Sequence, residues 1–423
     1  MSASAQWVHE LSALMTDVHE RIPLPDGMRD VLPVEAGEIG ALERALSSVF
    51  ASYGYRQVQT PLLELSDVLD RAQDEGVGRA YRLFDDQGRV LVLRPDLTIP
   101  IARLIATRMA DEPGPLRVSY NARAVQPPSA GTGRAAERRQ AGIELCGPGG
   151  AEDDAEVIAA LSSALAAAGL PGARVAIGSV ALVAAVLEAA GVTGETADAL
   201  WRALRGRSMV AWRAEARAVK GVKGRLRAVL DDLPTVRGGV EVLGRIAKAA
   251  PGAAQECARL ARTVELVTAQ GMPAPMIDLG VMRDWSYYSG VVIEAYASGV
   301  AAPVAVGGRY DGLGARFGRP RSAVGVAVTL ELLHHAVGGP EGIEPVGVVV
   351  VGGLDDRVTA AAMLRATGVP VVAVPLKQRD VDAFAAADGR RYVARPVKAG
   401  WRVRDVMTGA TSTVASLEEG PWT

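Results

Sequence analysis

The chain has 423 residues, and its hydrophobic content of 49% is enough for a large core. This length exceeds what one ordinary hydrophobic core supports, so the sequence predicts two or three domains. The net charge of −2 excludes a global electrostatic attraction to nucleic acid or to an anionic membrane surface.

The N-terminal segment does not resemble a signal peptide, because acidic residues and histidines interrupt its apolar residues. No apolar run approaches the roughly 20 residues that span a bilayer, so no membrane contact is expected. The two cysteines, Cys146 and Cys257, have no CxxC or histidine spacing and are predicted to be free, buried thiols. These features together predict a cytoplasmic protein.

Helices and strands alternate along the first 150 residues. Residues 1–22 are expected to form a short helix, and a second helix runs from Val34 to near Gly54, where apolar residues recur at helical spacing. Residues 127–139 form a polar loop that is rich in arginine. Strands are predicted at 55–64, 116–126 and 140–147, and a β-hairpin is predicted at 81–93.

Three polar residues in this region have both a structural and a functional interpretation. Asp96 follows the predicted hairpin and can cap the helix that begins after it. Gln140 and Glu144 are four residues apart on one strand, so they point to the same face of the sheet. That face is either solvated or a polar patch that binds a small cationic or amphoteric ligand.

A helix at 152–168 begins with three acidic residues at its positive end, and a strand follows at 174–177. The next region, about 180–270, is mainly helical. Within it, residues 202–227 carry nine basic residues against a single acid, Glu215. This is the chain's only candidate for a nucleic-acid surface. Charge runs on helices are usually solvated faces, so no nucleic-acid partner is expected.

The stretch from Ile277 to Glu294 begins as a buried strand, breaks at Gly280 and carries one arginine, Arg283, in an apolar setting. A buried arginine needs an anionic partner. The stretch is therefore either a hairpin with a structural salt bridge or a segment whose arginine binds a ligand carboxylate. Tyr287 and Tyr288 follow; adjacent residues on a strand point to opposite faces, so only one of them can face a given ligand.

Beyond a linker at 338–345, residues 346–423 alternate apolar strands and short helices and end in a predicted hairpin, which indicates a small α/β domain. The sequence contains no HExxH, GxSxG or phosphate-binding loop and no cluster of metal ligands. No catalytic residue, metal or cofactor is therefore predicted.

Five segments in order resemble the catalytic core of the histidyl-tRNA synthetases, a class II synthetase fold, over roughly residues 20–335. They are PDGMRDVLP (25–33), RPDLT (94–98), the stretch 117–147, DLGVMRDWSYYSG (278–290), and GGRYDGLGARFG (307–318) with AVGVAVTLELL (323–333). The resemblance implies an α+β fold, an antiparallel sheet flanked by helices. It implies core segments at 1–178 and 271–337, a helical insertion at 179–270 and a C-terminal α/β domain at 346–423.

The resemblance also implies a histidine site. It places Asp96, Thr98 and Gln140 at the α-ammonium group of the ligand. It places Glu144 and Tyr288, with Tyr287 beside them, at the imidazole. It places Arg283 at the carboxylate, with Arg123 as an alternative. The chemistry of these side chains fits such a ligand, because carboxylates and amides bind ammonium groups and arginine forms paired hydrogen bonds with carboxylates.

Two departures from the synthetase pattern concern ATP. Val125 stands where a glutamate reads adenine, and Leu332 stands where an arginine stacks on ATP. A third departure is Ser286, in place of an acid. The chain is similar to a group of synthetase paralogues, the regulatory subunits of ATP phosphoribosyltransferase in histidine biosynthesis. That similarity implies a non-catalytic subunit that dimerises through its synthetase-like core, assembles with a short-form catalytic subunit and carries histidine feedback.

Two other functions remain open on the sequence. One is a divergent histidyl-tRNA synthetase, in which the basic segment 202–227 would contact tRNA. The other is a free-standing, synthetase-like sensor with a different partner. The sequence also leaves open whether feedback histidine binds this chain or the catalytic subunit.

Overall fold

The computed structural model describes residues 23–72, 80–128, 135–282, 287–338 and 346–422. The chain divides into two compact units, with residues 39–337 as the body of one and residues 338–423 as the body of the other. The helix predicted at 1–22 lies outside the described residues, as do Arg283 and Ser286. No helix of the described part combines the length and apolar character needed to cross a membrane.

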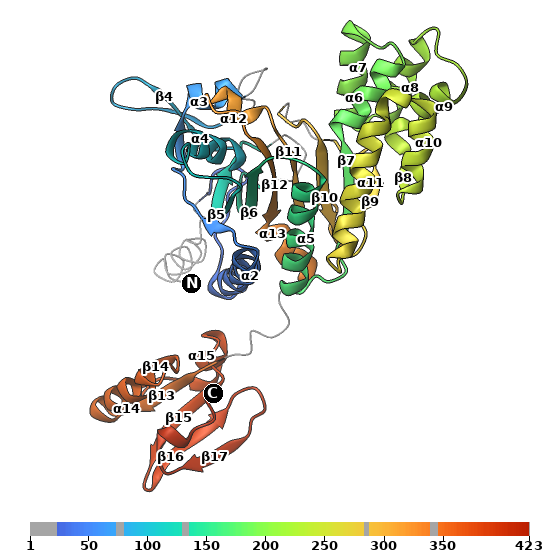
Figure 1. Ribbon diagram of the computed structural model, residues 1–423. Helices are drawn as coiled ribbons and strands as arrows, with labels where there is room; N and C mark the ends of the chain where they lie inside the picture. The colour runs from blue at the N-terminus through green and yellow to red at the C-terminus, as the bar shows by residue number, and fades with distance from the viewer. Residues whose placement is uncertain (1–22, 73–79, 129–134, 283–286, 339–345, 423) are drawn as a thin grey trace, which may run out of the picture. The chain divides into compact units, whose positions relative to one another are not determined.

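A nine-stranded sheet forms the centre of the larger unit, in the order β1-β5-β6-β12-β11-β10-β7-β9-β8 (Figure 1). From β5 to β7 each neighbouring pair is antiparallel. The strands are β1 (Arg56–Gln57), β5 (Leu116–Val125), β6 (Glu137–Gly147), β7 (Arg174–Ser179), β8 (Arg237–Gly238), β9 (Met276–Asp278), β10 (Val291–Tyr296), β11 (Ala305–Arg309) and β12 (Ser322–Thr329). The predicted antiparallel sheet is confirmed.

The two faces of this sheet carry different clusters because neighbouring residues of a strand point in opposite directions. On β6, Ile143 and Leu145 join a large core with the helices α2 (Pro33–Ser52) and α5 (Ala151–Ala167). Cys146 of the same strand joins a second cluster with α4 (Thr98–Arg108). Gln140 and Glu144 share the parity of Cys146, so they belong to the α4 face, and both are buried. A solvated face is therefore excluded.

A small three-stranded sheet, β2-β4-β3, stands beside α4 in the same unit. Its elements are β2 (Leu63–Leu65), α3 (Ser66–Ala72), β3 (Arg82–Phe84) and β4 (Val90–Leu93). The predicted hairpin at 81–93 is confirmed, because β3 pairs antiparallel with β4. The strand predicted at 55–64, with a bend at Pro61, is present as two short strands: β1 joins the large sheet and β2 the small one, with Pro61 between them.

The stretch from Ile277 to Glu294 does not form the hairpin considered above. Its two strands, β9 and β10, both pair with β7, which lies between them. Tyr287 and Tyr288 lie before β10 rather than on a strand, and their ring centroids are 4.9 Å apart. The alternation rule therefore does not apply to them, and both rings can belong to one cluster.

Helices between β7 and β9 form the predicted helical region (Figure 1). They are α6 (Val180–Ala189), α7 (Gly194–Arg205), α8 (Met209–Ala218), α9 (Gly224–Asp232), α10 (Glu241–Ala249) and α11 (Ala254–Ala269). Trp212 is fully buried among them, and its indole N–H donates to the carbonyl of Leu230 at 2.8 Å. The basic residues of 202–227 lie mainly on the exposed faces of α7, α8 and α9.

The smaller unit has a five-stranded sheet in the order β14-β13-β15-β16-β17. The first three strands are parallel, and the predicted terminal hairpin extends the same sheet with antiparallel pairs. Val348 to Val351 are fully buried because clusters cover both faces. The elements are β13 (Val348–Gly352), α14 (Leu354–Ala366), β14 (Val371–Pro375), α15 (Val381–Ala387), β15 (Tyr392–Val397), β16 (Gly400–Asp405) and β17 (Thr411–Val414).

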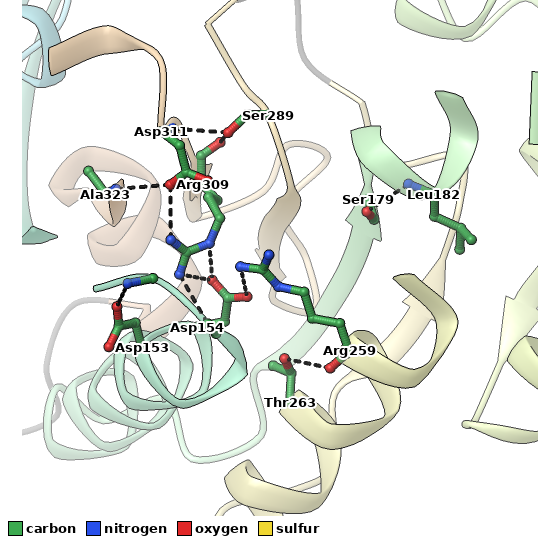
Figure 2. A network of polar contacts seen from close by, with 12 residues as sticks. Asp153, Asp154, Ser179, Leu182, Arg259, Thr263, Ser289, Arg309, Asp311 and Ala323 are labelled. Atoms are coloured by element: carbon green, nitrogen blue, oxygen red, sulfur yellow. Dashed lines mark hydrogen bonds and ion pairs between the residues drawn. The ribbon is translucent and has the colours of Figure 1, made fainter. Parts of the chain in front are cut away.

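A buried ion pair joins the sheet to two helices of the larger unit. Arg309 of β11 is 0% exposed; its Nε donates to Oδ1 of Asp154 at 2.8 Å, and its Nη2 lies 2.6 Å from the same oxygen. Arg259 of α11 donates to the other oxygen of Asp154 at 3.3 Å (Figure 2). The acid at the start of α5 therefore links β11 with α11, beyond complementing the positive end of its helix.

Replacing Asp154 with asparagine should lower the free energy of unfolding by about 3–5 kcal/mol, because Arg309 would remain buried without its main counter-charge. Urea denaturation of the two proteins measures the difference. Glu265→Gln removes an exposed acid that pairs with Arg262 on α11 and should cost less than about 1 kcal/mol. Equal losses in the two variants would show that the buried pair has no special role.

Candidate functional site

Glu144 lies at the centre of a polar cluster on the α4 face of the sheet. The residue is 1% exposed. Oε1 accepts a hydrogen bond from the Thr98 hydroxyl at 3.2 Å, and Oε2 accepts one from the Tyr310 hydroxyl at 2.6 Å. Burial raises the pKa of Glu144 to about 8, and the nearby Asp96 adds to the rise, while the two hydrogen bonds act against it.

Asp96 is the second buried acid of the cluster, at 8% exposure. Its Oδ2 accepts a hydrogen bond from the Tyr287 hydroxyl at 3.4 Å, and its Oδ1 has no hydrogen-bond partner among the described residues. Burial raises the pKa of Asp96 to about 7, although the nearby amide of Ile99, the Tyr287 hydroxyl and the charge of Arg138 act in the opposite direction. The cap residue of α4 is Leu97, without a side-chain hydrogen bond, so Asp96 lies one residue before the cap position, with its carboxylate facing the amide of Ile99 in the first turn.

Four tyrosines surround the two acids. Tyr287 packs edge-on against Tyr310, with ring centroids 6.0 Å apart, and is tilted against Tyr288. Tyr120 is buried on β5, and its pKa is raised well above the usual value by burial and then by the charge of Glu144. The acids are therefore enclosed by rings that offer hydroxyl groups and aromatic faces. Such a setting suits a planar cation or a heterocycle.

Glycines on three adjacent strands make room for these side chains. A Cβ at Gly325 of β12 would lie 1.5 Å from Oε2 of Glu144, its cross-strand partner. A Cβ at Gly142 of β6 would lie 2.4 Å from the Tyr120 ring, and one at Gly308 of β11 would lie 2.8 Å from the Tyr288 ring. In the sequence, the glycine pair Gly307–Gly308 indicates that another group approaches the backbone closely there. The sequence does not indicate which side chain that is.

The structure brings together most of the predicted ligand-binding residues. Thr98 donates a hydrogen bond to Glu144, and Tyr287 donates one to Asp96. Tyr288 adjoins Tyr287, and Gln140 is 8% exposed on the same strand face as Glu144. Arg283 lies outside the described residues.

Arg123 does not belong to this cluster. On β5 its neighbours Ala122 and Ala124 pack in the α4-face cluster, so alternation directs Arg123 to the other side. Its Nη1 pairs with Oε1 of Glu137 at 2.7 Å, and its side chain is 54% exposed. The alternative placement of Arg123 at a ligand carboxylate is therefore disfavoured.

Sequence reasoning missed two polar residues of the site. Tyr310 supplies the shortest hydrogen bond to Glu144. Arg138 shares the strand face of Gln140 and Glu144, donates to the Gln126 side chain at 3.2 Å, and lowers the pKa of Asp96 by its charge. The period-two rule that paired Gln140 with Glu144 also selects Arg138, but the residue was assigned to a loop, and β6 in fact begins at Glu137.

The ion pair in Figure 2 is also connected to the segment that carries Tyr287 and Tyr288. The backbone carbonyl of Arg309 accepts a hydrogen bond from the amide of Ser289 at 2.8 Å. The Ser289 hydroxyl accepts one from the amide of Asp311 at 2.9 Å, and Asp311 pairs with Arg309 at 3.0 Å. The residues that flank Tyr310 and the residue that follows Tyr288 are therefore held together by the backbone and the guanidinium group of Arg309.

This arrangement offers acceptors for a cationic ligand. The described residues contain no group of three or more His, Cys, Asp or Glu side chains that could hold a metal ion. Both cysteines are free and buried, as predicted. Val125 and Leu332 depart from the synthetase pattern, and neither side chain carries a charge. Val125 is buried, and Leu332 packs against the large core.

Comparisons with known proteins agree with the resemblance. The histidyl-tRNA synthetase family profile matches residues 27–333. The ATP phosphoribosyltransferase regulatory subunit of Moorella thermoacetica is 39% identical over 83% of this chain and 92% of that protein. The regulatory subunit of Symbiobacterium thermophilum is 38% identical over 90% of this chain and 97% of that protein.

A solved structure from Bacillus halodurans C, described as an ATP phosphoribosyltransferase regulatory subunit/histidyl-tRNA synthetase, superposes with a TM-score of 0.76. The two chains are 32% identical, and the superposed region covers 87% of this chain and 96% of the Bacillus halodurans chain. The predicted α+β fold, a class II synthetase-like antiparallel sheet flanked by helices with a separate C-terminal sheet, is confirmed.

The raised pKa of Glu144 predicts how stability depends on pH. Its pKa is about 8 in the folded chain and about 4.3 when unfolded, so the folded state binds more protons between these values and loses stability as pH rises. Glu144→Gln cannot ionise. Its free energy of unfolding relative to the unmodified chain should therefore rise by about 2 kcal/mol between about pH 6 and pH 8. Urea denaturation measures this difference; a constant value would contradict the burial of a titrating group.

Proposed function

Because the chain belongs to the ATP phosphoribosyltransferase regulatory subunits, a branch of the histidyl-tRNA synthetase family, we propose that it binds histidine and regulates a catalytic ATP phosphoribosyltransferase subunit in the first step of histidine biosynthesis. The main support is the pair of buried acids, Glu144 and Asp96, enclosed by tyrosines. Buried acids without a counter-cation are costly. A ligand with an ammonium and an imidazole group offsets that cost at both.

The α-ammonium group of histidine is assigned to Asp96. Oδ1 of this residue has no partner among the described residues and can accept one of the three ammonium hydrogens. Gln140 and Thr98 complete the surroundings of that group. As the ligand binds, its positive charge favours the ionised form of Asp96 and lowers a pKa that burial has raised to about 7.

The imidazole ring is assigned to Glu144 and Tyr288. A carboxylate accepts from one ring nitrogen, and a phenol can donate to or accept from the other. Glu144 is already held by Thr98 and Tyr310, so its orientation does not have to be set during binding. The tyrosine rings provide flat apolar walls for the heterocycle.

The carboxylate of histidine is assigned to Arg138, with Arg283 as a second cation from the segment outside the described residues. Arg138 shares the face of Gln140 and lies close enough to Asp96 to affect its pKa. A zwitterion places its carboxylate beside its ammonium group, so a cation next to Asp96 is suitably placed. Arg123 faces the other side of the strand and pairs with Glu137.

We assign the chain a regulatory role without ATP chemistry. Leu332 and Val125 provide neither the guanidinium plane that stacks on adenine nor a charge for the triphosphate. Arg123 is held by Glu137, away from the acid cluster. These features support loss of the ATP site.

Feedback requires that histidine bind the less active state of the assembly more tightly, typically by about 1–3 kcal/mol. The proposed assembly contains dimers of this chain, formed through the synthetase-like core, together with short-form catalytic subunits. In this arrangement, the energy of histidine binding at the acid cluster is coupled to the activity of a different polypeptide.

Mixing the purified chain with a short-form catalytic subunit tests this function. Phosphoribosyltransferase activity should require both proteins, and histidine should reduce it. The Glu144→Gln complex should keep its activity and lose most of the inhibition, which would place the feedback ligand on this chain. Histidine-dependent exchange of pyrophosphate with ATP by this chain alone would instead indicate a divergent synthetase.

Glu144→Gln should weaken histidine binding by more than tenfold, because an amide cannot compensate the charge of the ligand and leaves the Tyr310 and Thr98 donors poorly matched. Isothermal titration calorimetry on the full chain measures the change. Glu137→Gln is the matched control on the same strand, since Glu137 pairs with Arg123 on the opposite face. Unchanged affinity in Glu144→Gln would mean that the cluster does not bind histidine.

Arg138→Gln should weaken histidine binding about tenfold or more and leave histamine binding nearly unchanged, because histamine has no carboxylate for the guanidinium. Calorimetric titration of each variant with both ligands separates the two effects. Arg123→Gln should behave as the unmodified chain with either ligand. If Arg123→Gln weakened histidine binding but not histamine binding, and Arg138→Gln weakened neither, the ligand carboxylate would be assigned to Arg123 instead.

A further inference from the structure

A cavity of about 270 Å³ lies between the helical region and the large sheet, apart from the acid cluster. Its walls come from the turn between α7 and α8, from the short helix η1 (Leu233–Thr235), and from residues at the end of β9 and at Tyr296 of β10. Leu204, Met209 and Val281 give it an apolar wall, while Arg207 and Arg237 supply two guanidinium groups.

The first guanidinium is held in place by a buried acid. Arg207 ends the turn after α7 with a φ of +51°, a conformation that favours glycine. Its Nη2 lies 2.9 Å from both oxygens of Glu294, which is fully buried on β10. The Tyr296 hydroxyl donates to the same carboxylate. Arg207 adopts this backbone conformation and places its guanidinium group against Glu294 of β10.

The second guanidinium is held in the same way. Nε of Arg237 pairs with Oδ2 of Asp278 at 2.8 Å, and Oδ1 of Asp278 accepts from the amide of Gly280 at 2.9 Å. A Cβ at Gly280 would lie 2.5 Å from the carbonyl oxygen of Pro234. The close backbone approach at Gly280 fixes this wall of the cavity against η1.

The geometry points to a binding site for a small organic monoanion, whose acidic group is held by Arg207 and Arg237 and whose apolar part lies against Leu204, Met209 and Val281. Guanidinium groups match a carboxylate through paired N–H donors. The ion pairs engage Nη2 of Arg207 and Nε of Arg237, so both side chains retain N–H groups for a ligand.

Charge and size narrow the class of ligand. Glu294 and Asp278 neutralise much of the two positive charges, so the cavity favours a single negative charge over a polyphosphate. Its volume lies near the lower limit of ligand pockets, which begin at about 300 Å³. A compact carboxylate with a short apolar or aromatic body fits both limits.

Benzoate is a suitable probe, with benzamide as its uncharged counterpart and inorganic phosphate as an anion without an apolar body. Calorimetric titration of the full chain should show one site for benzoate, with benzamide and phosphate at least tenfold weaker. Met209→Trp fills the cavity without disturbing either ion pair and should abolish benzoate binding. Arg237→Gln should weaken it at least tenfold, and Arg213→Gln, on an exposed part of α8, should not.

Histidine titration of the same variants separates this site from the acid cluster, because Met209→Trp should keep its histidine affinity whether or not histidine is the regulatory ligand. Three results would overturn the proposal: no saturable benzoate binding up to about 10 mM, equal binding of benzamide, or unchanged benzoate affinity in Met209→Trp.

Discussion

The buried contact between Arg309 and Asp154 connects parts of the larger unit that are distant in sequence. Arg309 belongs to β11, Asp154 to the first turn of α5, and Arg259, which completes the contact, to α11. Taking these charges out of water is costly, and the hydrogen bonds around them offset that cost only in this arrangement. A shift of α5 relative to the sheet would leave Arg309 buried without its main partner.

Arg309 also connects this ion pair to the polar cluster on the opposite face of the sheet. Arg309 points toward α5, while the next residue, Tyr310, reaches Glu144 on the other side. The carbonyl of Arg309 also holds Ser289, which follows the two tyrosines. The ion pair therefore fixes the aromatic side chains around the acids without contacting a ligand.

Glycines and acids at the site oppose ordinary stability. Glu144 fits only because Gly325 has no side chain, and burial raises the pKa of that acid to about 8. A chain selected for stability alone would fill this space with apolar side chains. Two acids are nevertheless buried here, each within hydrogen-bond distance of a tyrosine hydroxyl, and the function proposed above gives a reason for this arrangement.

The sequence by itself determined the local elements and the family. Helical spacing located α2, period-two alternation placed Gln140 and Glu144 on one face, and five ordered segments identified the synthetase-like core. Tertiary structure decided the partners: β7 separates β9 from β10, Asp96 accepts a hydrogen bond from Tyr287, and Arg138 acts on the pKa of Asp96 while Arg123 pairs with Glu137. Periodicity fixes the face on which a side chain lies, because it depends on neighbouring residues. Which face becomes the site, and which strands adjoin, depends on contacts between residues more than a hundred positions apart, as between Glu144 and Tyr310.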